Sequence, residues 1–126
     1  MFARLLMFIA CLGLSATLMA QTGHPAKGSW SGDYGSAATE TTRMRLLIES
    51  HNGELSGTIN PGRRAVEMSS AVLDASTWTL TIRAPMPEGE MVMTGTLSNL
   101  GSWTNRKYIG TYTQAGKKGN FEFTLN

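Results

Sequence analysis

Three stretches of this sequence place a glycine in the middle of an alternating apolar–polar segment: LSGTIN at 55–60, MTGTLS at 93–98 and YIGTYT at 108–113. Alternation with a period of two is typical of a β-strand that buries one face. Glycine weakens such a strand, because it has no side chain to pack. In each stretch the glycine falls on the apolar face, and Gly32 does the same in the first strand; the four are Gly32, Gly57, Gly95 and Gly110. A glycine on a concave face relieves crowding and lets the strand bend, so these positions predict a sheet that curls until its inner face meets itself.

Turn residues divide the chain after residue 27 into about eight short strands. The Asn52-Gly53 pair is the clearest of these turns, since a type I′ hairpin needs two positive φ angles. The fourth strand, with Val66, Met68 and Val72 on its apolar face, is irregular, and we expect a kink at Ser69-Ser70. Closure would remove the exposed edges of an open sheet. We therefore predict an all-β fold, a single small antiparallel up-and-down β-barrel of about eight strands over residues 28–126.

The first 20 residues predict a secretory signal peptide. Arg4 gives a positive start, residues 5–14 are apolar or small, and a cut after Ala20 is expected. Two alternatives stay open: FIAC at 8–11 is a poor lipoprotein box that would lipidate Cys11, and residues 5–20 could remain as an anchor, although they are short for a bilayer span of about 20 residues. We expect a cleaved, periplasmic or secreted protein, with a flexible segment at 21–27 and no stable membrane insertion.

Composition excludes several classes of function. The only cysteine, Cys11, leaves with the signal peptide, so the mature protein has no disulfide, no thiol nucleophile and no thiolate metal ligand. Without residues 1–20 the chain carries ten Lys and Arg against nine Asp and Glu. This near-neutral balance lacks the basic footprint of a nucleic-acid-binding protein, so no nucleic-acid partner is predicted.

Motifs for catalysis and metal binding are missing from the sequence. Neither His24 nor His51 has a second ligand at metal spacing, and there is no nucleophile elbow or phosphate-binding loop. The carboxylates Asp33, Glu49 and Glu67 alternate with apolar neighbours, so they should point outward and not converge as an acid–base pair. We therefore predict a protein that is not an enzyme, with no catalytic residues, no metal and no cofactor.

Five aromatic residues share the predicted inner face: Trp30, Tyr34, Trp78, Tyr108 and Tyr112. One interpretation is that they simply pack the core. The other is that the glycine positions leave a cavity, in which tyrosine hydroxyls orient a small apolar or amphipathic ligand. Trp103 differs because it lies in a loop rich in glycine, serine and asparagine, which makes it a candidate anchor for a protein partner.

Two segments resemble a known family. GSWSGDYGS at 28–36 resembles the first strand of avidin-type biotin-binding barrels, and GELSGT at 53–58 resembles their Gly-x-Leu-Thr-Gly-Thr motif. Similar motifs recur in lipocalin-like barrels, so the resemblance implies a small eight-stranded meander barrel of the calycin type. By position, Ser36 corresponds to a ligand-contacting serine of avidins, whereas Gly32 and Ile59 stand where that family has an asparagine and a tyrosine that bind ligand.

These observations lead us to expect an exported, non-enzymatic binding protein. Its partner would be a small apolar or amphipathic ligand or an exported protein. An inhibitor of a secreted hydrolase is the first alternative. An uncharacterised enzyme or a small outer-membrane barrel is the second, although most of the expected strands are shorter than the 9–11 residues of a membrane strand.

Overall fold

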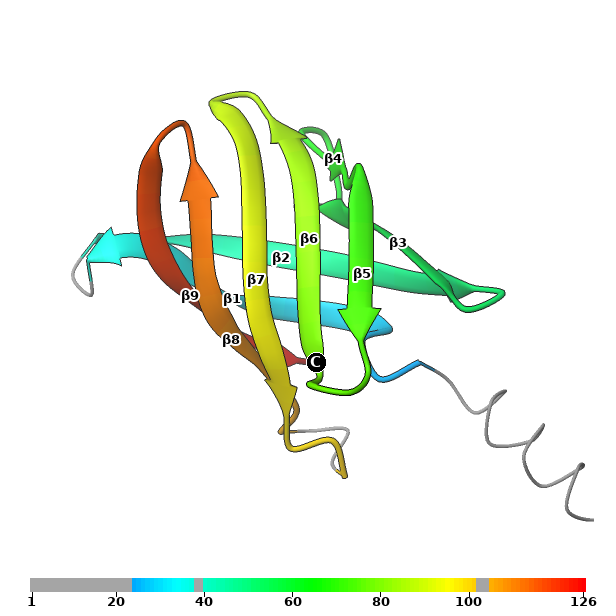
Figure 1. The fold of residues 1–126 in the computed structure, drawn as a ribbon. Coiled ribbons are helices and arrows are strands. Elements are labelled where there is room, and N and C mark those ends of the chain that lie inside the picture. The colour runs from blue at the N-terminus through cyan, green and yellow to red at the C-terminus, as the bar shows by residue number, and fades with distance from the viewer. Residues whose placement is uncertain (1–23, 38–39, 102–104) are drawn as a thin grey trace, which may run out of the picture.

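The computed structural model describes residues 24–37, 40–101 and 105–126, and its elements are all strands (Figure 1). They are β1 (Gly28–Ala37), β2 (Glu40–His51), β3 (Glu54–Ile59), β4 (Val66–Glu67), β5 (Ser70–Asp74), β6 (Thr79–Met86), β7 (Gly89–Ser98), β8 (Lys107–Gln114) and β9 (Lys117–Leu125). The predicted signal peptide and Trp103 lie outside the described residues. Among those described, no helix is long and apolar enough to cross a membrane.

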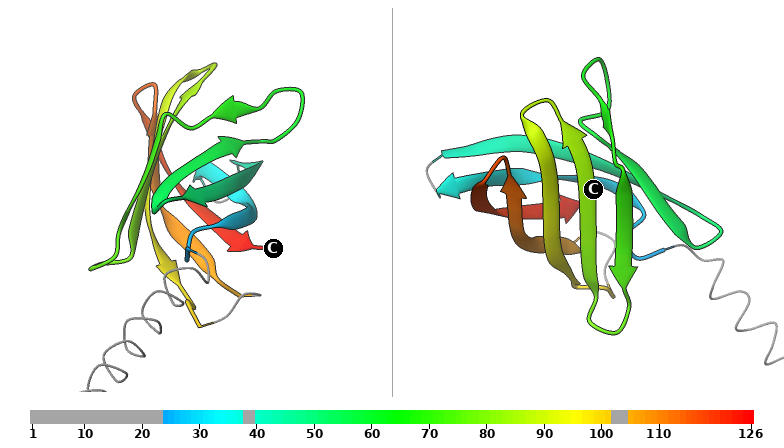
Figure 2. Two further views of the ribbon diagram at one scale, coloured as in Figure 1. Left: turned by 90° about the vertical axis from the view of Figure 1, so that its right-hand side faces the viewer. Right: turned by 45° about the horizontal axis from the view of Figure 1, so that its top comes forward.

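All nine strands belong to one antiparallel sheet, in the order β4-β3-β2-β1-β9-β8-β7-β6-β5. The first and last strands of the chain pair directly, from Trp30 opposite Leu125 to Gly35 opposite Asn120. The sheet curls into a half-barrel, in which β1 and β2 cross behind β6, β7 and β8 (Figures 1 and 2). The predicted all-β, up-and-down barrel architecture is thus confirmed.

The fourth expected strand is divided in two, which gives nine strands where about eight were predicted. At the division the chain moves from one sheet edge to the other: the Met68 N–H donates to the Gly57 carbonyl at 2.9 Å, and the Ser69 N–H donates to the Arg83 carbonyl at 2.8 Å. β4 therefore pairs with β3, whereas β5 pairs with β6. Beyond the kink β3 and β5 diverge without pairing, so the sheet is open along this side (Figure 1). We call this opening between β3 and β5 the seam.

The kink also reverses which residues of β5 face inward. Ala71 is buried and Leu73 packs against the core, whereas Val72 is 63% exposed. The prediction that Val72 lies on the apolar face is therefore wrong. One extra residue at Ser69-Ser70 shifts the period-two alternation by one position, and a shift of one moves every following side chain to the opposite face.

The concave face of the sheet is filled by apolar side chains from every long strand. The largest fully buried residues are Trp30, Met44, Leu46, Ile48, Ile59, Leu80, Ile82, Met91, Met93, Tyr108 and Phe123. Burying a side chain of this size stabilises the fold by roughly 1.5–3 kcal/mol before the entropic cost of ordering it. The chain has a single cysteine, so it cannot form an internal disulfide, and this core supplies most of the favourable free energy.

One end of the half-barrel is held by Arg106, whose side chain is buried. Its guanidinium donates to the Pro25 carbonyl at 2.8 Å and to the Leu100 carbonyl at 2.6 Å. The Trp30 indole N–H donates to the Ala26 carbonyl at 2.9 Å. Residues 24–27, part of the segment expected to be flexible, are therefore packed against the end of the sheet.

The four glycines predicted on the inner face lie there, and none faces bulk water. Gly32 and Gly95 are buried, and Gly57 and Gly110 are half-buried. A Cβ atom on Gly32 would overlap the Glu122 carbonyl of β9, and one on Gly110 would overlap the Thr94 carbonyl of β7. At these two positions the neighbouring backbone occupies the space of a side chain, so glycine is required by close approach.

Adding one methyl group at Gly32 should therefore destabilise the protein strongly. We expect Gly32→Ala to lower the free energy of unfolding by about 3 kcal/mol, because the backbone of β9 must move. Gly101→Ala is the matched control, since a Cβ there would meet nothing within 4 Å, and it should change stability by less than about 0.5 kcal/mol. Urea unfolding followed by tryptophan fluorescence measures both, and equal midpoints would contradict the close approach.

Candidate functional site

Four of the five predicted inner-face aromatic residues lie together inside the sheet. Trp30, Tyr108 and Tyr112 are buried, and Tyr34 is half-buried. The rings of Trp30 and Tyr108 meet edge to face with centroids 6.3 Å apart, and those of Tyr34 and Tyr112 do so at 5.2 Å. These separations are those of favourable aromatic pairs in a packed core.

Trp78 does not join them, and its predicted inner-face position is wrong. It lies in the turn between β5 and β6, where its φ angle is +55° and its exposed fraction is 37%. β6 begins only at Thr79. The alternation with Leu80 and Ile82 suggested one continuous strand, but the positive φ changes the direction of the chain at Trp78. Its carbonyl still accepts a hydrogen bond from the Leu97 N–H of β7 at 2.9 Å, whereas its side chain is exposed.

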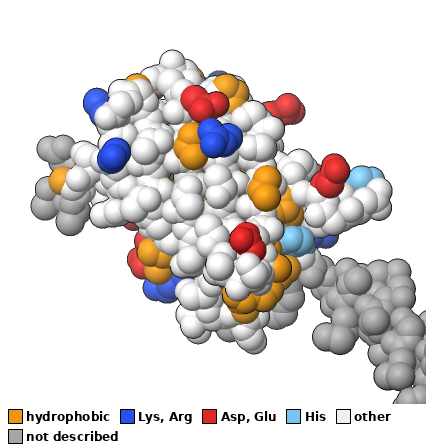
Figure 3. Space-filling model, in the orientation of Figure 1, with side chains coloured by type: hydrophobic (Ala, Val, Ile, Leu, Met, Phe, Trp, Pro, Cys, Tyr) orange, Lys and Arg blue, Asp and Glu red, His pale blue; other side chains and the backbone are white. Residues whose placement is uncertain are grey.

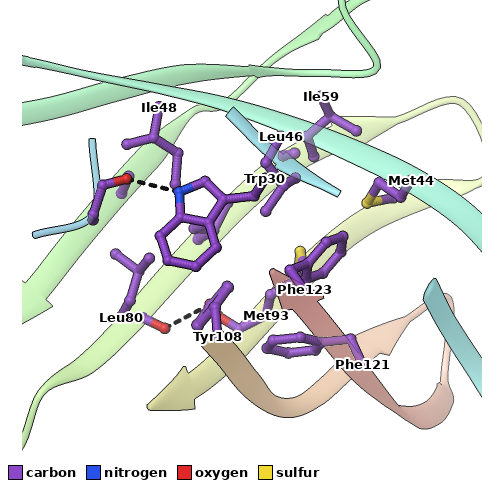
Figure 4. Close-up of a cluster of buried hydrophobic side chains, with 14 of the residues drawn as sticks. Trp30, Met44, Leu46, Ile48, Ile59, Leu80, Met93, Tyr108, Phe121 and Phe123 are labelled. Carbon is purple, nitrogen blue, oxygen red and sulfur yellow. Dashed lines mark hydrogen bonds between the residues drawn. The ribbon is translucent and has the colours of Figure 1, made fainter. Parts of the chain in front are cut away.

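The glycine positions do not leave an empty layer. A Cβ atom built on Gly95 would lie 2.8 Å from the Cζ atom of the Phe121 ring. A Cβ atom built on Gly57 would lie 2.9 Å from the sulfur of Met68. Tyr108 contacts the rings of both Phe121 and Phe123 (Figure 4). The space that the sequence assigned to a ligand is thus occupied by the protein's own side chains.

The buried hydroxyl of Tyr108 is also engaged within the fold. It donates to the Leu80 carbonyl at 2.7 Å and lies 3.4 Å from the Met93 carbonyl (Figure 4). Burial raises the pKa of this hydroxyl well above its ordinary value. Burial, together with the nearby Tyr34, also raises the pKa of Tyr112. Tyr108 therefore acts as a neutral donor that ties β8 to β6.

Within the described residues, no group of three histidine, cysteine, aspartate or glutamate side chains comes close enough to hold a metal ion. Arg106 and Gln114 are the buried polar or charged residues of the described chain. Three exposed ion pairs, Arg43–Asp33, Arg83–Glu90 and Lys107–Glu122, span 3.5–3.9 Å on the outer surface. Exposed pairs of this kind contribute little to stability.

The seam holds a cleft of about 460 Å³ that opens at the surface. Leu55 of β3 and Ala71 and Leu73 of β5 give it an apolar floor that continues into the core. Val72 also lines this cleft, and its side chain is exposed to solvent. Val72 and Trp78 are two of the three exposed large hydrophobic residues of the described chain. Figure 3 shows hydrophobic side chains reaching the surface on this face of the molecule.

His24 also lines the cleft and is held there by the chain that follows it. Its Nδ1 atom accepts a hydrogen bond from the Ala26 N–H at 3.1 Å, which requires that nitrogen to be unprotonated. Partial burial lowers the pKa of the imidazole below its ordinary value. At neutral pH this wall of the cleft is therefore polar but uncharged.

A second cleft of about 580 Å³ lies on the outside of β1, β9 and β8. Exposed Ile109 and the carboxylates Asp33 and Glu122 line it. These two carboxylates belong to ion pairs already, with Arg43 and Lys107. The strand at the centre of this cleft, β9, is paired on both sides, since it lies between β1 and β8. Along β9 this cleft therefore offers no free strand edge.

The seam residues were missed by sequence reasoning, because they depend on the kink. The usable signal was the break in alternation at Ser69-Ser70: beyond it Ala71 and Leu73, and not Val72, continue the apolar face. Ser36, which the avidin resemblance marked as a ligand contact, is exposed near the end of β1.

Comparison of this chain with protein-family models, curated proteins and solved structures gives no match. The site must therefore be interpreted from its own geometry.

The raised pKa of Tyr108 predicts a loss of stability at alkaline pH. The folded protein keeps this proton at a pH where the unfolded chain has released it. Stability is therefore unaffected below the unfolded pKa of about 10, and above it falls by about 1.4 kcal/mol per pH unit for each such group. Urea unfolding at intervals from about pH 9 to about pH 11 should give a shallower decline for Tyr108→Phe than for the wild type. Identical slopes would contradict the burial of an un-ionised hydroxyl.

Proposed function

We propose that this protein is an exported, non-enzymatic binding module that holds a protein partner on its outer surface. The observation that carries the proposal is the filled interior. A small-ligand barrel needs a hollow lined by a few convergent polar groups. Here the inner-face aromatic rings contact one another, and the hydroxyl of Tyr108 is committed to a backbone carbonyl.

The outer surface supports the same proposal. Its strands carry alternating polar side chains, the reverse of the lipid-facing pattern of outer-membrane barrels. Against that polar background Val72 and Trp78 are exposed on β5 and the turn after it. Val72 also lines the cleft at the seam, and an exposed hydrophobic residue beside a cleft is typical of protein-binding surfaces. The avidin-like motifs support a small barrel, but an avidin-like ligand would need the interior space that Phe121 and Met68 fill.

Two measurements on the exported protein, purified from its own host, test this function. Native mass spectrometry should give the mass of the polypeptide alone, because the protein's own side chains occupy the space near the inner-face glycines. Covalent cross-linking in the host's exported fraction should then identify a protein partner, and the purified partner should bind with a measurable Kd. The destabilised variant Gly32→Ala is the control. A protein that is captured at least as well by this variant binds core residues exposed by unfolding and not the native surface.

Either of two results would overturn the proposal. One is a small molecule bound at one copy per chain whose removal shifts the fluorescence of buried Trp30. The other is the absence of any partner that prefers the wild-type protein to Gly32→Ala.

A further inference from the structure

The seam presents two stretches of strand edge that lack a partner strand among the described residues: the outer edge of β5, and the part of β3 before Gly57, after which β3 pairs with β4. β5 is the last strand of the sheet and pairs only with β6. On β3 the Gly57 carbonyl points away from β2, since it accepts from Met68. Backbone groups of alternate residues point to the same edge, so those of Leu55 point into the seam. A cleft with backbone donors and acceptors on both walls is suited to an added strand.

β5 also lacks two of the features that keep an edge strand from pairing. Its sequence, SAVLD from Ser70 to Asp74, contains no lysine and no proline. Natural sheets usually protect an open edge with such residues, with a bulge that twists it away or with a covering segment. Here the kink lies before β5 and leaves the strand itself regularly paired with β6, and the outward residue at the centre of β5 is the exposed Val72.

The exposed charged side chains around the seam are mostly acidic, which favours a basic partner. Glu54 lines the cleft and Asp74 ends β5, and both are exposed. Glu49 and Glu67 line an adjoining cleft of about 250 Å³ on the outside of β3. None of these four carboxylates belongs to an ion pair of the described residues. The basic pair Arg63-Arg64 lies in the turn at the other end of β3.

We infer that the seam binds an extended, basic segment of a partner protein, which adds a strand between β3 and β5. Its backbone pairs with the free edges, an apolar side chain enters the floor at Leu55 and Leu73, and lysine or arginine side chains face Glu54 and Asp74. A second copy of this chain fits less well, because it would bring the same carboxylates to the seam. The inference rests on the proposed function and names the site and class of its partner.

A library of random twelve-residue peptides displayed on phage, selected on the exported protein, tests the inference. We expect enriched sequences to alternate apolar residues with lysine or arginine. A synthetic peptide of that kind should bind in fluorescence anisotropy, and methylation of its alternate backbone nitrogens should weaken binding by roughly thirtyfold, because two hydrogen bonds are lost. Hydrogen exchange should slow at Leu55 and in β5 when the peptide is bound.

Two matched variants locate the site. Val72→Lys places a like charge on the wall of the seam and should weaken binding by roughly tenfold or more. Ile109→Lys makes the same change at an exposed position on β8, away from the seam, and should leave binding unchanged. Both positions face solvent, so both variants should keep the unfolding midpoint of the wild type. Glu54→Gln should weaken binding of the basic peptide and reduce its salt dependence.

The inference is overturned if no peptide is enriched, if enriched peptides are not basic, or if Val72→Lys and Ile109→Lys bind equally. It is also overturned if sedimentation shows a dimer that Val72→Lys dissociates, because a second copy would then occupy the seam. If a host partner binds Val72→Lys and Ile109→Lys with equal affinity, the seam is not its binding site, but the proposed function still holds. Failure to find any partner would reject both.

Discussion

The close approach of backbones at Gly32 and Gly110 is the constraint on which the rest of this structure depends. Without a side chain at these positions, β9 can lie against β1 on one side while β8 lies against β7, and the sheet can turn through its sharpest bend. That bend brings the inner faces of β1 and β2 against those of β6 and β7. The buried aromatic and aliphatic side chains then fill one core between them.

Filling the core decides what the protein can bind. In a small barrel the same inner positions either pack against one another or surround a ligand. Here the ring of Phe121 and the sulfur of Met68 occupy the space near Gly95 and Gly57, and the ring of Phe123 packs against that of Phe121. The glycines therefore allow the sheet to curve and do not create room for a ligand. The proposed function therefore assigns recognition to the outer surface and to the one side where the sheet does not close.

The sequence predicted the fold better than the site, for a physical reason. Alternation and the Asn52-Gly53 turn are local signals, and the structure bears them out: both turn residues have positive φ angles. The pairing of β1 with β9 followed from the inward glycines. The predictions failed where a single residue changed the alternation. The positive φ of Trp78 removed it from β6, and the extra residue at Ser69-Ser70 exposed Val72. A period of two cannot locate such a shift, because the pattern looks regular on either side of it.

The position of the seam follows from the same geometry. The close backbone approaches at Gly32 and Gly110 lie in the middle strands of the sheet, and its two edges meet on the other side, where a kink joins them at Met68 and Ser69. A strand added between β3 and β5 would pair both free edges and cover Leu55 and Leu73, which now line an open cleft. Any segment that binds only this folded arrangement also stabilises it, in proportion to the logarithm of its concentration relative to its Kd. Partner binding and closure of the barrel would then be the same event, so the least stable side of the fold would be the one that a partner completes.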